Sequence, residues 1–171
     1  MRARSIAVVS AAAALAAGVL VTAATAAGDH GHRGTSDAKS SQRENRALFA
    51  VMTGRKEVGP DNRRGAGDPD GRGSFTAIVD DGQLCFGITV KNVDQPVAAH
   101  IHRARPNRSG PIVVPLTQPA TGDPGASSGC VAVDPALAAA ILKHPHKYYA
   151  NVHTTAFPAG AVRGQLFGRS R

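Results

Sequence analysis

The sequence has no tryptophan, and its aromatic residues are limited to two tyrosines and five phenylalanines among 171 residues. Proteins that stack nucleic-acid bases combine aromatic with basic side chains, and no such fingerprint is present. The formal net charge is +8, but charge alone indicates solubility and non-specific association rather than a defined partner. We therefore expect no nucleic acid among the partners.

The patterns of common catalytic sites are also missing. No serine lies in a GxSxG elbow, and no pair of carboxylates stands in a strand context suited to acid–base chemistry. The sequence therefore predicts a protein that is not an enzyme. Metal-dependent redox chemistry is the one catalytic route left open.

Long apolar runs are limited to the amino terminus. Arg2 and Arg4 precede an alanine-rich apolar run over 6–21, which small residues follow at 24–26. This three-part pattern predicts a secretory signal peptide over 1–27, with no membrane span after its cleavage. The alternative is a membrane anchor, because the run approaches the roughly 20 residues that span a bilayer. We favour the signal peptide, and with it a secreted protein located outside the cell or in the cell envelope.

Cysteine is scarce as well, with only Cys85 and Cys130. Their spacing excludes a CxxC redox motif and a cysteine zinc site, both of which need close pairs. An exported chain with an even number of cysteines is expected to form disulfides. Each cysteine is out of phase with the apolar residues of its predicted strand, so both should point away from the core. We therefore predict a Cys85–Cys130 disulfide between neighbouring strands.

Residues 28–45 are almost entirely polar and predict a disordered linker, because they cannot bury enough surface to offset their ordering entropy. A single domain is expected over 46–168. Alternation of apolar and polar residues, separated by Gly, Pro, Asp and Asn clusters, predicts its strands. They are expected at 48–52, 74–79, 84–90, 97–102, 112–116, 129–133, 148–154 and 161–167.

One short helix should connect two of these strands. It begins at Asp134-Pro135, an N-cap followed by proline, and ends before Pro145. The predicted fold class is all-β, an antiparallel β-sandwich or barrel of about eight strands with one short connecting helix.

Three stretches carry a resemblance to a known family, at 67–90, at 98–116 followed by 129–145, and at 148–166. Together they resemble the CHRD family, a module repeated in the developmental antagonist chordin and found alone in exported bacterial proteins. The resemblance implies a compact extracellular β domain and no known catalytic activity. One departure is Arg103-Ala104-Arg105, where relatives commonly have glycine directly after the HIH motif.

Histidine forms the clearest constellation of chemistry-bearing residues. His100 and His102 flank one residue of a predicted strand, so their rings share a face, and His153 is in phase with Tyr149 and Asn151 on another strand. A strand HxH with a distant third histidine is a workable ligand set for zinc or copper, and the HxH is similar to that of copper-zinc superoxide dismutases. The alternative is that these histidines hydrogen-bond within the sheet and serve folding.

Two further polar residues lie in the last predicted strands. Arg163 either holds a carboxylate or a ligand anion, or joins its strand to a loop. Asn151 is a candidate hydrogen-bond partner of the histidines, and with Arg163 it forms a candidate surface.

The sequence as a whole favours a secreted, non-enzymatic binding or structural module without a cofactor. Its expected partner is an extracellular protein or a cell-envelope polymer. The alternative is a zinc- or copper-binding protein with a superoxide-dismutase-like histidine site.

Overall fold

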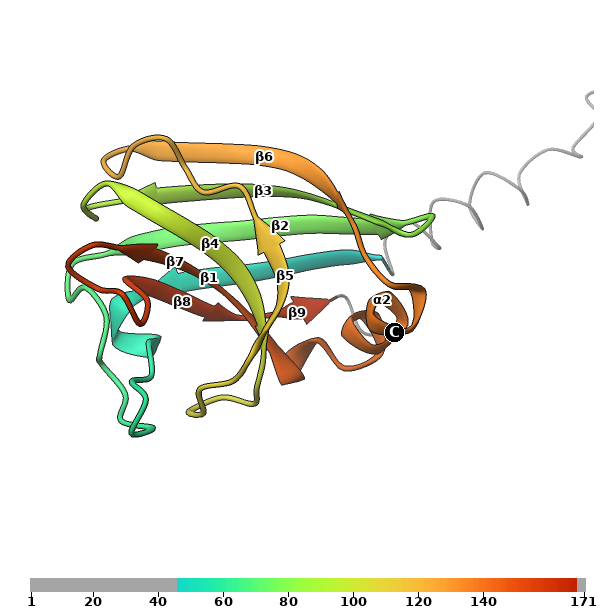
Figure 1. The fold of residues 1–171 in the computed structure, drawn as a ribbon, viewed down its shortest axis with the longest axis horizontal. Coiled ribbons are helices and arrows are strands. Elements are labelled where there is room, and N and C mark those ends of the chain that lie inside the picture. The colour runs from blue at the N-terminus through green and yellow to red at the C-terminus, as the bar shows by residue number, and fades with distance from the viewer. Residues whose placement is uncertain (1–45, 169–171) are drawn as a thin grey trace, which may run out of the picture. The chain divides into compact units, whose positions relative to one another are not determined.

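The computed structural model describes residues 46–168 (Figure 1). The predicted signal peptide, 1–27, and the predicted linker, 28–45, lie outside the described residues. Among the described residues, no helix is long and apolar enough to cross a bilayer.

Strands are the main regular structure of the described chain, with one short α-helix. The strands are β1 (Ala47–Thr53), β2 (Arg72–Asp80), β3 (Gln83–Lys91), β4 (Pro96–Arg103), β5 (Ile112–Leu116), β6 (Gly125–Ala132), β7 (Tyr148–Thr154), β8 (Val162–Gln165) and β9 (Phe167–Gly168). The helix α2 spans Pro135–Lys143, and single 3₁₀ turns, η1 and η2, span Gly54–Lys56 and Pro145–Lys147.

The strands form one antiparallel sheet in the order β5-β4-β7-β8-β1-β2-β3-β6, with the two-residue β9 paired to β1. The sheet curls so that its two edge strands approach each other, as Figure 1 shows. The Ser127 hydroxyl on β6 donates to the Thr117 carbonyl just after β5, at 2.8 Å. The predicted all-β class is therefore confirmed, as an eight-stranded, nearly closed antiparallel barrel.

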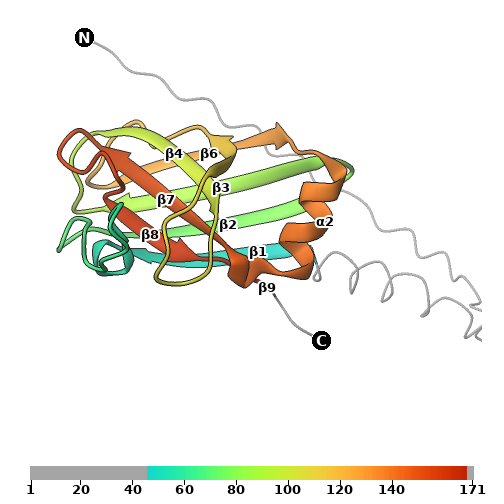
Figure 2. The same ribbon diagram turned by 60° about the horizontal axis from the view of Figure 1, so that its bottom comes forward.

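Alternation along the strands fills the interior of this barrel. On β2 the residues Phe75, Ala77 and Val79 are buried, while the residues between them face outward. The same alternation runs along β3 and β4. The helix covers one end of the barrel with the fully buried Ile141 (Figure 2). Period-two patterning in the sequence thus translates directly into one core.

The predicted helix start is confirmed in detail. Asp134 precedes the helix, and its carboxylate accepts from the Leu137 N–H at 3.0 Å. Pro135 occupies the first turn, where a missing N–H costs no intrahelical bond. Lys143 is the last helical residue, two positions before Pro145.

Four predicted strands are longer in the structure by one or two residues at one or both ends, and two others differ more. β6 begins at Gly125 rather than at 129, because its first residues are small and carry no apolar alternation. The last predicted strand is divided at Leu166, which is buried and donates its N–H to the Tyr148 carbonyl at 2.9 Å. This contact separates β8 from β9.

The predicted disulfide is confirmed. Cys85 on β3 lies directly opposite Cys130 on β6, and the two are bonded, with Cα atoms 3.9 Å apart. That separation is shorter than the 4.4 to 6.8 Å usual for disulfides. Both side chains face away from the core, as their phase in the sequence predicts.

Candidate functional site

The outer face of β4, β7 and β8 carries an unusual set of polar side chains. Cross-strand pairs bring His100 opposite Asn151, His102 opposite Tyr149, and Asn151 opposite Arg163. Every residue of β7 is buried, including those that point away from the core. Loops therefore cover this outer face, and its polar groups sit away from bulk water.

The three predicted histidines converge on this face. One ligand nitrogen from each of His100, His102 and His153 lies within 4.8 Å of the others. Nδ1 of His100 and Nε2 of His153 lie 3.2 Å apart. Two nitrogens bound at 2.0 to 2.1 Å on a tetrahedral ion are separated by about 3.3 Å. One pair already has this spacing, which is also that of a hydrogen bond between the two rings.

Backbone carbonyls orient two of the rings. Nδ1 of His102 lies 2.8 Å from the Gly110 carbonyl, and Nδ1 of His153 lies 3.0 Å from the Pro158 carbonyl. A carbonyl can only accept, so both Nδ1 atoms carry the proton and both Nε2 atoms present a lone pair. A hydrogen bond from the other ring nitrogen to a backbone carbonyl is the usual support of a metal-ligating histidine.

Burial keeps these histidines neutral. Burial lowers the pKa of His100 from 6.5 to about 4, and the charges of His153 and His102 act in the same direction. Burial also lowers the pKa of His102 and of His153, opposed in each case by the hydrogen bond to a carbonyl. Their lone pairs are therefore free of protons near neutral pH.

Three buried polar atoms of the described residues lack a hydrogen-bond partner, and all belong to this region. They are Nε2 of His102, Nδ2 of Asn151 and Oε2 of Glu57. Oδ1 of Asn151 lies 3.1 Å from Nε2 of His153. Both atoms are hydrogen-bond acceptors when Nδ1 of His153 carries the proton. Turning this amide by 180° would direct a donor at His153, because oxygen and nitrogen of an amide differ only by assignment.

Glu57 was not identified from the sequence. It lies just after η1 in a loop without periodicity, yet it is 1 % exposed. Gly160, at φ +135°, makes room for it, because a Cβ at this position would collide with Oε2 of Glu57 and crowd the Asn151 amide. Burial raises the pKa of Glu57, while its bond to the Val58 N–H and the charge of Arg163 act against the rise.

Tyr149 connects the histidines to Arg163. Its ring stacks on the His102 ring with centroids 4.8 Å apart and an 8° angle between the planes. The Arg163 guanidinium lies 3.4 Å from the centroid of the same Tyr149 ring. The phase of Tyr149 with His153 was visible in the sequence, but its contacts with neighbouring strands were not.

A family model described as CHRD domain matches residues 48–166, from β1 to the end of the barrel. The chain belongs to the CHRD domain family. No curated protein and no solved structure matches it significantly. The matched span includes all three histidines, both cysteines, Asn151 and Arg163, so the family resemblance in the sequence is confirmed.

Within this CHRD domain, Arg103 ends β4, and Ala104 and Arg105 begin the loop that follows it. Its backbone folds onto β8, where Arg163 donates to the carbonyls of Arg108 at 2.9 Å and Arg105 at 3.3 Å. Arg163 thus joins its strand to a loop, the second of the two roles predicted for it.

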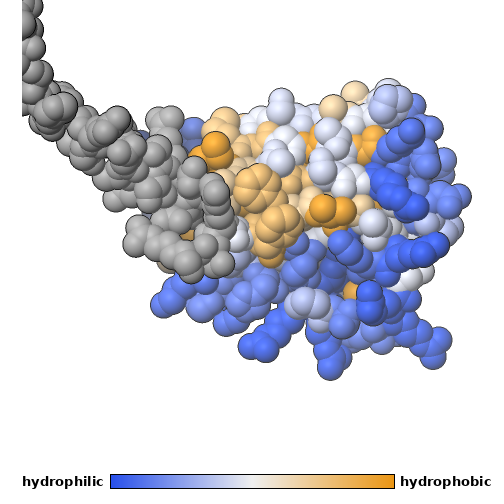
Figure 3. Space-filling model, turned by 180° about the vertical axis from the view of Figure 1, so that it is seen from behind, coloured by the Kyte–Doolittle hydropathy of each residue, from blue (hydrophilic) through white to orange (hydrophobic). Residues whose placement is uncertain are grey.

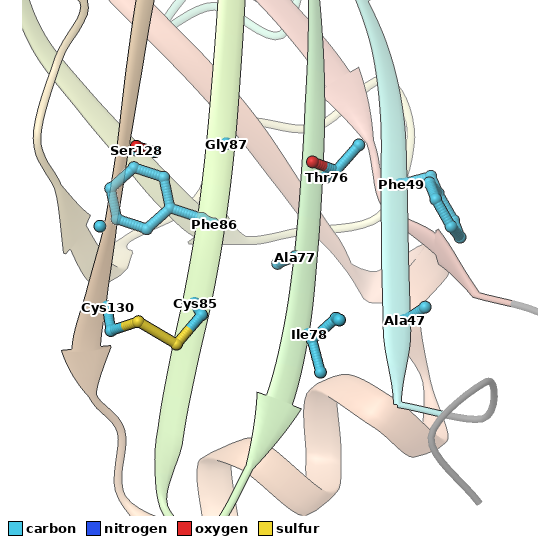
Figure 4. A pocket seen from close by; sticks show the side chains of 11 residues that line it. Ala47, Phe49, Thr76, Ala77, Ile78, Cys85, Phe86, Gly87, Ser128 and Cys130 are labelled. Atoms are coloured by element: carbon cyan, nitrogen blue, oxygen red, sulfur yellow. A yellow bond between two sulfur atoms is a disulfide. The ribbon is translucent and has the colours of Figure 1, made fainter. Parts of the chain in front are cut away.

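The opposite outer face of the CHRD domain is apolar. A shallow groove of about 580 Å³ crosses β1, β2, β3 and β6 and includes the disulfide (Figure 4). Phe49 and Ile78 are 38 % and 50 % exposed beside it. Figure 3 shows the apolar surface bordered by hydrophilic loops. This surface is apolar and exposed, whereas the histidine face is polar and covered by loops.

Proposed function

We propose that this CHRD-domain protein is exported and binds one zinc or copper ion through His100, His102 and His153. The observation that carries the proposal is Nε2 of His102, a buried lone pair without a partner that faces two other imidazoles. A histidine retained only for folding would be expected to satisfy both ring nitrogens, because an unsatisfied buried acceptor costs about 1–3 kcal/mol.

The donor set supports a transition metal. Three neutral imidazoles suit zinc and copper, whereas magnesium and calcium prefer oxygen ligands. The carbonyls of Gly110 and Pro158 fix the two rings that they contact, so little side-chain entropy is lost on binding. His100 is less buried than the other two histidines. It completes the set from β4, two residues before His102 and on the same face of the strand. Three protein ligands leave a fourth position for water or another small ligand.

The expected export of the protein also supports the proposal of a histidine metal site. The disulfide between Cys85 and Cys130 is typical of an oxidising compartment. Outside the cytosol, a histidine site is also a more robust metal site than one built from thiolates, which oxidise. A soluble extracellular or cell-envelope location remains part of the proposal.

The test is metal titration of the purified mature protein by calorimetry, with elemental analysis of the protein as isolated. We expect one equivalent of zinc or copper to bind. His102→Ala should abolish stoichiometric binding, while His146→Ala, which removes an exposed histidine outside the cluster, should leave it unchanged. Circular dichroism must show that His102→Ala keeps the β fold.

Absence of saturable binding of either metal by the wild-type protein would contradict the proposal. So would equal loss of binding in His102→Ala and His146→Ala, because that would indicate adventitious capture by histidines. A conservative variant, His102→Gln, keeps most of the volume and separates loss of a ligand from loss of packing.

The other role predicted from the sequence, a binding or structural module for an extracellular protein or cell-envelope polymer, stays a prediction. The apolar groove over β1, β2, β3 and β6 is the surface that favours it, and an uncharged groove is better suited to a protein than to a charged polymer. The prediction that the protein is not an enzyme also stays a prediction.

A further inference from the structure

A second pocket lies beside the histidine face, between β8, β9 and two loops. It has a volume of about 350 Å³. One loop follows η1 and the other connects β4 to β5, and they touch where the Ser109 N–H donates to Oδ1 of Asn62 at 3.2 Å. Figure 2 shows both loops at the side of the barrel where β8 runs. The pocket is therefore framed by fixed backbone on several sides.

Arg163 forms part of the wall of this pocket and is 2 % exposed. Its guanidinium donates to two backbone carbonyls and to Oε1 of Gln165 at 3.4 Å. Among residues 46–168, no carboxylate oxygen lies within 4.0 Å of it, since the two ion pairs found there involve other arginines. A buried cation is normally paired with an anion, whereas Arg163 forms no ion pair here: its guanidinium lies against the Tyr149 ring, and the Glu57 carboxylate acts on it only from beyond 4.0 Å.

Two more cations line the same pocket. Lys56 donates from Nζ to the Val51 carbonyl at 2.8 Å, and Arg64 lines the pocket from the neighbouring loop. No aspartate or glutamate contributes to the lining. Three positive charges with no negative one raise the local concentration of anions.

Part of the remaining wall is apolar, and Asn107 and Gln165 add uncharged polar groups. Val51 and Phe167 both line the pocket and are 59 % and 52 % exposed. The Phe167 ring is held by stacking on Phe49, with centroids 5.7 Å apart. A ligand that places its charged group at the cations can therefore cover this ring with an uncharged part.

We propose that this pocket binds a phosphate monoester whose organic group is apolar. The phosphate would lie among Lys56, Arg64 and Arg163, because a dianion matches three cations better than a single carboxylate does. The organic group would lie against Val51 and Phe167. This site is separate from the histidine cluster, and its occupation does not depend on a metal.

The test uses phenyl phosphate as the probe on the intact mature protein, followed by NMR or calorimetry. We expect saturable binding, with shifts of the amide signals of the two loops and of β8. Arg64→Gln should weaken binding by about five-fold, the effect of losing one charge-assisted hydrogen bond at a partly exposed site. Arg63→Gln is the matched control, since it removes the same charge from the preceding residue, which does not line the pocket.

Phe167→Ser should weaken phenyl phosphate but leave inorganic phosphate unchanged. Arg163 is avoided as the test residue because its substitution can disrupt the fold. Equal weakening by Arg64→Gln and Arg63→Gln would overturn the proposal, since it would show general electrostatic attraction. Binding of inorganic phosphate as tight as that of phenyl phosphate would overturn the apolar subsite, and equally tight benzoate would overturn the preference for a dianion.

Discussion

Replacing both cysteines with serine tests how far the barrel depends on its covalent link. Cys85 and Cys130 are 45 residues apart in the sequence, and their bond closes that loop in the unfolded chain. For a loop of this length, the chain-entropy relation gives a stabilisation of about 4 kcal/mol at 25 °C. Both side chains are exposed, so the substitution should add little from lost packing.

This loss of free energy of unfolding can be converted to a drop in melting temperature. An unfolding entropy of about 2.1 cal/mol/K per residue over roughly 120 residues makes 4 kcal/mol equivalent to about 15 °C. The ladder between β3 and β6 runs from Gln83 opposite Ala132 to Val90 opposite Gly125, and none of its backbone hydrogen bonds requires the sulfur atoms. We therefore expect the double variant to fold and to melt at a much lower temperature.

Calorimetry of the wild-type protein and of Cys85→Ser/Cys130→Ser, both without metal, measures the difference. Reduction of the wild-type protein with a thiol reagent should produce a similar drop and serves as the control for the serine side chains. A drop of less than about 3 °C in both experiments would refute the reasoning, because the loop would then contribute almost none of its expected entropy.

Three further perturbations follow from particular contacts. Asp134→Ala removes the helix N-cap and should cost about 1 kcal/mol in chemical denaturation, whereas Asp134→Asn should cost less. Gly160→Ala should destabilise by more than 1 kcal/mol, as a strained left-handed position beside Glu57, and an unchanged denaturation midpoint would contradict the crowding seen there. The metal-free protein should lose stability as the pH falls from about 6.5 towards 4. The folded pKa of His100 is about 4, so the unfolded chain takes up the proton first, and His100→Gln should flatten this dependence.

Alternation was sufficient to predict most of the strands because the barrel has a single interior. The predicted ranges 112–116 and 148–154 coincide with β5 and β7. Where the first residues of a strand are small and polar, as in Gly125-Ala126-Ser127-Ser128, alternation gives no signal and hydrogen bonding to β3 alone defines the strand. The choice between sandwich and barrel depends on strand pairing, which periodicity does not encode.

The convergence of the histidines was also accessible from the sequence. His100 and His102 share a face because strand side chains alternate, and the phase of His153 places it on the outer face of β7. The contribution of Glu57 was not accessible, since it comes from a loop that reaches the site only through tertiary packing. The same is true of the Gly110 carbonyl, which orients His102 from eight residues along the chain.

The distribution of unsatisfied polar groups is the strongest argument that this face has a role beyond stability. Among the described residues, the three buried side-chain atoms without a partner come from Glu57, His102 and Asn151. Each such atom costs about 1–3 kcal/mol, and apolar side chains of similar volume would avoid that cost. Within residues 46–168 the barrel interior has no such group, so the cost is confined to the histidine face and to Glu57 beside it. A metal ion would take up the free lone pair of His102. Metal binding therefore accounts directly for the unsatisfied atom that belongs to the cluster of three imidazoles.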